Sequence, residues 1–166
     1  MYHTGYSSSL LKKKAERNLK RLEQEYEKNE NRERLYSYLA ETYYYLGDNI
    51  QTEKYARLDI ALGRRNVSYA SRSYRILIEL LKENDKRRLE LKDILEKSIN
   101  DFPKLPEFMA EYALYCASIF DYDMAIKNMM NAIALAGNYD DIEPTIFKNE
   151  KIEIAKKLIL DWKEIK

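Results

Sequence analysis

The sequence predicts an all-α fold of stacked antiparallel helical hairpins, and three observations lead to this prediction. Apolar residues recur at the three- and four-residue spacing of amphipathic helices along nearly the whole chain. Glycine and proline, which β-rich chains need for tight turns, number only 4 and 3 among 166 residues. The loops between successive apolar stripes are short, and short loops place neighbouring helices antiparallel.

The first four helices are recognised by their apolar stripes and by what interrupts them. The first carries one stripe from Leu11 to Tyr26 and is broken by the polar stretch KNENRE. The next two end at Gly47 and Gly63, because glycine tolerates the left-handed conformation of a helix end. The fourth breaks at the polar stretch ENDK. These helices cover about residues 8–28, 32–46, 50–62 and 68–82.

The last four helices are bounded by proline, glycine and acidic residues. The fifth stops before Phe102 and Pro103, and Pro106 suits the first turn of the sixth. Gly137 closes the seventh, and the acidic stretch NYDDIEP leads into the eighth, where negative charge favours a helix N-terminus. These helices cover about residues 86–100, 106–119, 122–136 and 144–166.

The predicted hairpins recur at a regular period. Their first helices begin near residues 32, 68 and 106, so the period is 36 and then 38 residues (68 − 32 and 106 − 68). This is close to the 34-residue period of tetratricopeptide repeats. We therefore expect one right-handed, tetratricopeptide-like stack over residues 8–166, with hairpins at about 32–63, 68–102 and 106–137 and with capping helices at about 8–28 and 144–166.

The repeat pattern is clearest in the third hairpin. Ala113, Ala125 and Ala132 take the small positions at which two helices cross closely, and Met129 takes a bulky one. The stretch LYSYLAETYYYLGD in the first hairpin also fits, but Asp59 in its second helix lies near a position for a small apolar residue. The middle hairpin retains mainly the closing stretch SINDFP.

A run of three tyrosines, Tyr43 to Tyr45, supplies the candidate binding residues. One helix face cannot bury three consecutive side chains. Tyr43 fits the core position, so Tyr44 and Tyr45 project either toward the concave groove of the stack or onto an adjacent helix. The first helix of each hairpin lines that groove, which makes four residues candidates for partner binding: Arg34, Glu41, Tyr44 and Tyr45.

Catalytic chemistry is not indicated by any motif of the sequence. The stretch DYD at Asp121 to Asp123 could pair carboxylates around a metal, but its place in a turn favours a helix cap. Cys116 lies on the inner face of its helix and is predicted to be a core residue. The sequence shows no nucleophile–base arrangement, phosphate loop or metal cluster. We therefore expect no cofactor and no enzymatic activity for this chain alone.

The net charge and the cysteine content indicate which cellular compartment and which classes of partner to expect. With a formal net charge of +1, the protein is not attracted electrostatically to nucleic acid or to membranes, so we expect neither as a partner. A single cysteine excludes an internal disulfide, and no apolar run reaches membrane-spanning length. These features predict a cytoplasmic protein whose partners are proteins or peptides.

The N-terminal stretch resembles a known domain junction. HTGY is followed by KKKAERNLKRLEQEYE and then by YLAETYYYLGD. This order is similar to the end of the catalytic domain in bacterial family-2 glycosyltransferases that carry a C-terminal tetratricopeptide-like region, a subgroup that includes peptide S-glycosyltransferases. The matching residues are His3, Gly5, Tyr6, Lys14, Glu16, Arg17, Asn18, Leu22 and Glu23.

The resemblance implies a parent enzyme with a nucleotide-sugar donor and a divalent metal, for which His3 would be a ligand. Residues 1–7 would then be the remnant of an upstream catalytic domain, or else a disordered tail. The chain itself would be a non-catalytic module that docks the acceptor, forms a homodimer or braces the catalytic domain. The alternative is a stand-alone tetratricopeptide adaptor or regulator that binds a peptide segment of another protein.

Overall fold

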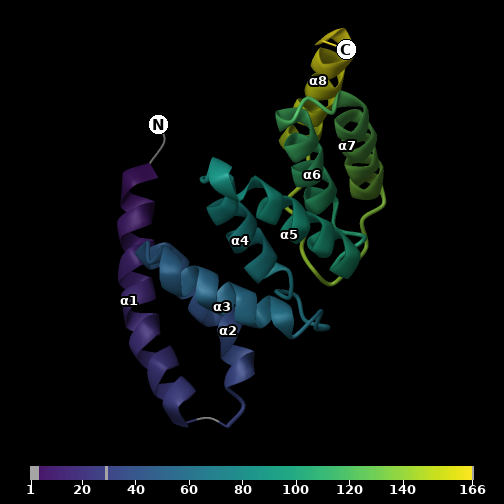
Figure 1. Cartoon of the computed structure of the whole chain (residues 1–166). Coiled ribbons are helices and arrows are strands. Elements are labelled where there is room, and N and C mark those ends of the chain that lie inside the picture. The colour runs from purple at the N-terminus through teal and green to yellow at the C-terminus, as the bar shows by residue number, and fades with distance from the viewer. Residues whose placement is uncertain (1–3, 29, 166) are drawn as a thin grey trace. The chain divides into compact units, whose positions relative to one another are not determined.

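A computed structural model describes residues 4–28 and 30–165, with side chains from Leu10 onward. Its α-helices are α1 (Thr4–Lys28), α2 (Tyr36–Leu46), α3 (Asn49–Ala61), α4 (Arg72–Lys82), α5 (Arg88–Asp101), α6 (Pro106–Ser118), α7 (Tyr122–Gly137) and α8 (Glu150–Ile165). Two short 3-10 segments precede α2 and α5, namely η1 (Arg32–Leu35) and η2 (Asp85–Arg87). No strand occurs within the described ranges, so the prediction of an all-α fold is confirmed (Figure 1).

Most helix ends follow the local signals of the sequence. Gly47 ends α2 at a φ of 79°, and Gly63 follows α3 at a φ of 76°. Pro106 occupies the first turn of α6, as predicted. The Asp121 carboxylate accepts a hydrogen bond from the Met124 N–H at 3.1 Å, so the predicted capping role of Asp121 is confirmed.

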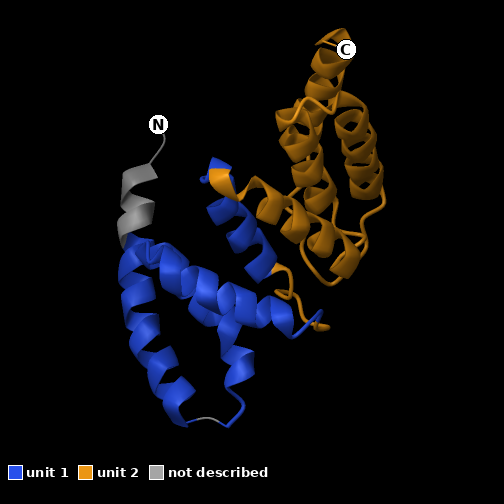
Figure 2. Ribbon diagram, viewed as in Figure 1, with its two compact units in different colours: residues 1–64, 72–85 blue, residues 65–71, 86–166 orange. Residues whose placement is uncertain are grey.

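The chain divides into two compact units, which Figure 2 colours separately. Unit 1 comprises residues 1–64 and 72–85, and unit 2 comprises residues 65–71 and 86–166. Unit 2 therefore includes a short segment that precedes α4 in the sequence. The predicted middle hairpin is divided by this boundary, because α4 belongs to unit 1 and α5 belongs to unit 2.

Helix α2 is the centre of unit 1, where it packs against α1, α3 and α4. Leu39 and Ala40 of α2 are fully buried, as are Ala56 of α3 and Leu77 of α4. Small residues on α2 and α3 allow these two helices to approach closely. The predicted hairpin of α2 and α3 is therefore present.

The polar residue that departs from the repeat pattern has a specific partner. Asp59 of α3 is buried, and its carboxylate accepts a hydrogen bond from the Ser73 hydroxyl of α4 at 2.7 Å. A buried carboxylate is costly unless donors satisfy it. This pair explains how unit 1 accommodates an acidic residue where the pattern favours a small apolar one.

A network of tyrosine rings joins the first three helices of unit 1. Tyr43 and Tyr55 stack with 5.7 Å between ring centroids, and Tyr26 meets Tyr55 edge-on at 6.0 Å. The Tyr43 hydroxyl donates to the Glu23 carboxylate of α1 at 3.2 Å. Burial, followed by the negative charge of Glu23 and the bond to it, raises the pKa of Tyr43 to about 12. Several of the 15 tyrosines therefore serve helix packing.

Unit 2 contains the hairpin that the repeat pattern identifies best. Helices α6 and α7 pack against each other, with α5 against α6 and α8 against α7 (Figure 1). Ala113, Ala125 and Ala132 are fully buried, and Met129 is almost so. The predicted small and bulky positions are therefore confirmed. Cys116 is buried as well, and burial raises the pKa of its thiol, as expected for a core residue.

The predicted start of the last helix is wrong. Helix α8 begins at Glu150 rather than near residue 144, and residues 142–147 alternate between exposed and buried positions. Glu143, Thr145 and Phe147 point inward in this stretch. An extended chain places alternate side chains on opposite sides, which is the pattern seen here. The acidic stretch before residue 144 therefore does not serve as the entry to a helix.

Tertiary hydrogen bonds hold this extended segment in place. The buried Glu143 carboxylate accepts bonds from the Ala70 N–H at 3.0 Å, from the Ser71 N–H at 3.2 Å and from the Ser71 hydroxyl. Thr145 donates to the Glu107 carboxylate of α6 at 2.6 Å. The same contacts correct the predicted start of the fourth helix, which begins at Arg72 rather than near residue 68, because Ala70 and Ser71 form a turn bound to Glu143.

Helix α8 completes unit 2 and packs against α7 through a narrow apolar face. Ala155, Ile159 and Trp162 are buried, whereas Ile154 and Ile165 are exposed. Trp162 therefore packs within the unit. Among the helices that the structure describes, none is long and apolar enough to cross a membrane.

Candidate functional site

The four candidate partner-binding residues come from α2 and from the 3-10 turn before it, and the structure places them in two environments. Glu41 of α2 forms an ion pair with Arg72 of α4, with 3.0 Å between carboxylate and guanidinium atoms. The Arg72 guanidinium also lies 5.4 Å from the centroid of the Tyr38 ring, within the range of a cation–π contact. Glu41 therefore belongs to a cluster that joins α2 to α4.

Tyr44 and Tyr45 extend this cluster toward solvent. The two residues are 38% and 43% exposed, and their rings meet edge-on with 5.9 Å between centroids. Burial raises the pKa of Tyr45, and the negative charge of Glu41 adds to the effect. The neighbouring Arg72 charge acts in the opposite direction. We call the surface formed by Tyr38, Glu41, Tyr44, Tyr45 and Arg72 the tyrosine surface.

Arg34 lies in the other environment. It belongs to η1, and its guanidinium forms an ion pair with the Glu25 carboxylate of α1 at 2.6 Å. Both side chains are substantially exposed, so this pair contributes little to stability. Its contact with α1 separates Arg34 from the ion pair of Glu41 and Arg72.

Two residues of the tyrosine surface were missed by sequence reasoning. Tyr38 follows from helical spacing, since Tyr38, Glu41 and Tyr45 are three and seven positions apart on one face of α2. Arg72 lies 31 positions after Glu41 in the chain (72 − 41) and reaches it only because α4 packs against α2. No local pattern in the sequence indicates that pairing.

The proposed metal ligand of a parent enzyme, His3, lies outside the described residues. Within the described part of the chain, no group of three or more histidine, cysteine, aspartate or glutamate side chains is arranged to hold a metal ion.

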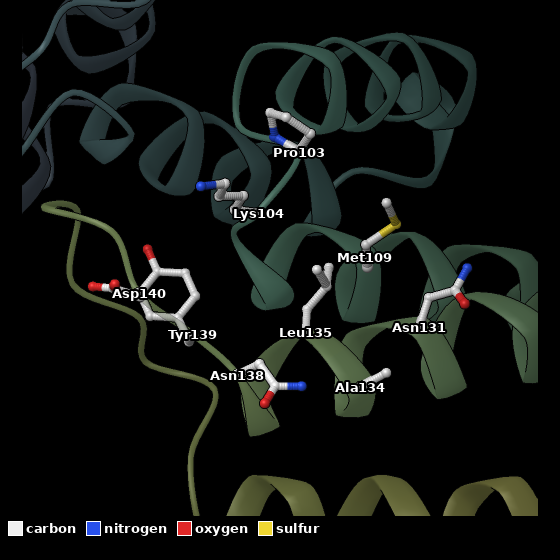
Figure 3. A pocket seen from close by; sticks show the side chains of 9 residues that line it. All are labelled: Pro103, Lys104, Met109, Asn131, Ala134, Leu135, Asn138, Tyr139 and Asp140. Carbon is white, nitrogen blue, oxygen red and sulfur yellow. The ribbon is translucent and has the colours of Figure 1, made fainter.

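Unit 2 contains a cavity that the sequence did not indicate. It has a volume of about 560 Å³ and lies among the turn after α5, the start of α6 and the end of α7. Figure 3 looks into it and shows residues from all these segments around one hollow. The lining residues are Pro103, Lys104, Met109, Asn131, Ala134, Leu135, Asn138, Tyr139 and Asp140.

The lining combines an apolar centre with polar groups at its edges. Met109 and Leu135 are half-buried and lie between the polar side chains in Figure 3. Asn131 and Asn138 supply neutral amides, while Lys104 and Asp140 supply one charge of each sign. Such a combination is typical of sites that bury an apolar group and orient it by a few hydrogen bonds.

Comparison of the chain with protein-family models, with curated proteins and with solved structures gives no match. The functional argument therefore rests on the two sites described above.

Proposed function

We propose that this chain is a helical protein-interaction module that contacts its partner through the tyrosine surface of unit 1. The observation that carries the proposal is the pair of exposed rings at Tyr44 and Tyr45. Tyrosine is enriched in protein interfaces, because it contributes a large, rigid contact area with little loss of side-chain freedom. The proposed location is the cytoplasm, in agreement with the single cysteine.

The base of the tyrosine surface supports this role. The ion pair between Glu41 and Arg72 joins α2 to α4 next to Tyr45. A binding surface gains affinity when its groups are already held in the bound arrangement, since less freedom is lost on association. The surface also presents aromatic faces beside one acidic and one basic group, which suits a partner of mixed polarity.

The experiment is site-specific photocrosslinking followed by a binding measurement. A photoreactive phenylalanine analogue at position 44 should capture a protein in the source cells that the same analogue at the exposed position 97 of unit 2 does not capture. Binding of the purified captured protein is then compared by calorimetry between the wild type and Tyr44→Ala/Tyr45→Ala. We expect affinity at least about tenfold lower for the double variant.

A stability measurement separates binding from folding. Both rings are partly exposed, so the double variant should lose less free energy of unfolding than the roughly 3 to 5 kcal/mol that replacing a single fully buried ring costs. A larger loss would mean that the rings belong to the core, and equal affinity would remove the tyrosine surface from the interface. Position 97 carries an exposed lysine and provides the matched control.

The junction-like stretch at the N-terminus supports a more specific role. It favours a module at the C-terminus of a family-2 glycosyltransferase, where the module docks the acceptor, mediates dimerisation or braces the catalytic domain. The alternative is an independent tetratricopeptide adaptor that binds a peptide segment of another protein. Reading the gene upstream of Met1 distinguishes the two, because only the first role requires an in-frame catalytic domain there.

A further inference from the structure

The outward face of α1 carries a stripe of positive charge. Figure 2 shows α1 along one side of unit 1, where Ala15 is buried and the helix packs against α2. At about 100° per residue, a set of exposed side chains falls within roughly one third of the helix circumference, on the side opposite Ala15. We call this set the basic stripe: Lys13, Lys14, Arg17, Lys20, Arg21, Gln24 and Lys28.

The cations of the basic stripe differ from the other exposed cations of the protein in lacking partners. On α3 and α8, an arginine or lysine pairs with a glutamate three or four positions away, as in Arg57 with Glu53 and Lys156 with Glu153. Among the described residues, no ion pair or hydrogen bond engages the six cationic side chains of the basic stripe. Their charge is therefore available to a binding partner.

The arrangement of these cations does not favour the helix itself. Arg17 lies three positions from Lys14 and Lys20, and four positions from Lys13 and Arg21. Like charges at these spacings are neighbours on a helix surface, and their repulsion destabilises the helix. The stability of α1 therefore does not explain the basic stripe, whereas a negatively charged partner would relieve the repulsion.

The surroundings of the basic stripe favour a narrow partner. Glu16, Glu23 and Glu27 are exposed and border one edge of it, so a flat anionic membrane or a nucleic acid duplex would also approach these carboxylates. Single-stranded nucleic acids are bound by aromatic side chains on which the bases stack, and the basic stripe contains none. A peptide chain is narrow enough to contact the cations alone. About seven extended residues would span the roughly 22 Å of the stripe.

We propose that the basic stripe of α1 binds an acidic peptide segment of a partner protein. Aspartate or glutamate carboxylates of that segment pair with the lysine and arginine side chains and relieve the repulsion around Arg17. The small net charge of the whole chain does not oppose this binding, because at physiological salt charges more than about 8 Å away are largely screened. The tyrosine surface lies on α2 and α4, so either proposal can fail without the other.

The test is an NMR titration of the isotope-labelled full chain with the capped peptide acetyl-Glu-Glu-Ser-Glu-Glu-Glu-Ser-Glu-amide at low salt. We expect the Nε–H signals of Arg17 and Arg21 to shift and saturate, while the signals of Tyr44 and Tyr45 do not move. The matched peptide with glutamine in place of every glutamate should bind at least about tenfold more weakly, since it carries no charge. The affinity for the acidic peptide should fall as salt is added.

Variants of the chain identify the basic stripe as the cause. Arg17→Ala/Lys20→Ala/Arg21→Ala should weaken binding of the acidic peptide at least about fivefold, because three neighbouring cations are lost. The control Lys97→Ala/Lys157→Ala/Lys163→Ala changes the net charge equally, at exposed helical positions of unit 2, and should leave binding unchanged. Circular dichroism checks that each variant is folded, and alanine at these positions favours the helix.

Three outcomes would overturn the proposal. One is the absence of saturable shifts at peptide concentrations of about 5 mM; vesicles of phosphatidylcholine and phosphatidylserine, or a DNA duplex, that bound under the same conditions would then assign the stripe to a membrane or to nucleic acid. Another is equal binding of the glutamate and glutamine peptides. The third is equal affinity of the two triple variants for the acidic peptide.

Discussion

The buried carboxylate of Glu143 should determine the stability of unit 2, and Glu143→Ala tests this directly. Glu143 is only 2% exposed, yet it lies in a segment without regular secondary structure. Its carboxylate accepts hydrogen bonds from Ala70 and Ser71, which lie more than seventy positions earlier in the chain. Alanine at this position removes the acceptor and leaves the donors buried.

The expected loss in free energy of unfolding follows from the number of hydrogen-bond donors that lose their acceptor. The Ala70 N–H also donates a turn hydrogen bond to the Val67 carbonyl at 3.2 Å, so it keeps an acceptor in the variant. The N–H and hydroxyl of Ser71 lose the acceptor that Glu143 provides. Each buried donor without an acceptor costs about 1 to 3 kcal/mol. Glu143→Ala should therefore lower the free energy of unfolding by about 2 to 6 kcal/mol, a large fraction of typical domain stability.

The assay is urea unfolding followed by circular dichroism, combined with hydrogen exchange. The two units need not unfold in one step, so the loss is read from the transition in which the amide of Ser71 loses protection. Glu143→Gln keeps one acceptor oxygen but no charge, and it should cost about 1 to 3 kcal/mol. Glu164→Ala, an exposed change on α8, should stay within about 0.5 kcal/mol of the wild type.

A loss below about 1 kcal/mol for Glu143→Ala would refute the reasoning. It would mean that the cost of removing the carboxylate from water already cancels the hydrogen bonds that it accepts. Unchanged protection of the Ser71 amide in the variant would refute it in a second way, since the turn would then be held by other contacts.

Two further predictions concern tyrosine ionisation and one helix end. The pKa values of Tyr43 and Tyr112 are raised to about 12 by burial and by the neighbouring carboxylates of Glu23 and Glu96. Because the folded state holds these protons more tightly than the unfolded state, the free energy of unfolding should fall as the pH rises from about 10 to about 12. Tyr43→Phe/Tyr112→Phe should remove the late phase of tyrosinate absorbance and weaken this pH dependence. An unchanged titration of the double variant would contradict the prediction. Gly47→Ala should lower the free energy of unfolding by about 1 kcal/mol, as measured by thermal unfolding. The φ of 79° disfavours a side chain, even though no atom lies within 4 Å of the added Cβ. An unchanged melting temperature would contradict this explanation of the end of α2.

Local patterns explain why the helices could be predicted. Gly47 and Pro106 mark helix ends through backbone preferences that act within a few residues. The small positions Ala113, Ala125 and Ala132 follow from a spacing that any close helix crossing requires. These features depend on neighbours in the sequence, so they can be read without knowing the tertiary contacts.

The candidate sites were predicted only in part. Tyr44, Tyr45 and Glu41 lie on one surface of unit 1, but their partner Arg72 comes from a helix far along the chain. The cavity of unit 2 was not predicted, because its lining residues come from three segments and share no motif. Bringing such segments together requires the packing of α6 against α7, which periodicity alone does not specify.

The sequence by itself determined that the chain is helical, where most helices end and which positions of α6 and α7 pack tightly. Only the tertiary structure decided the path of residues 139–149, the start of α4 and the division into two units. The physical reason is that helices form from interactions three or four residues apart, whereas the extended segment is stabilised by hydrogen bonds between Glu143 and Ser71 and between Thr145 and Glu107. Such long-range pairs leave no periodic trace in the sequence.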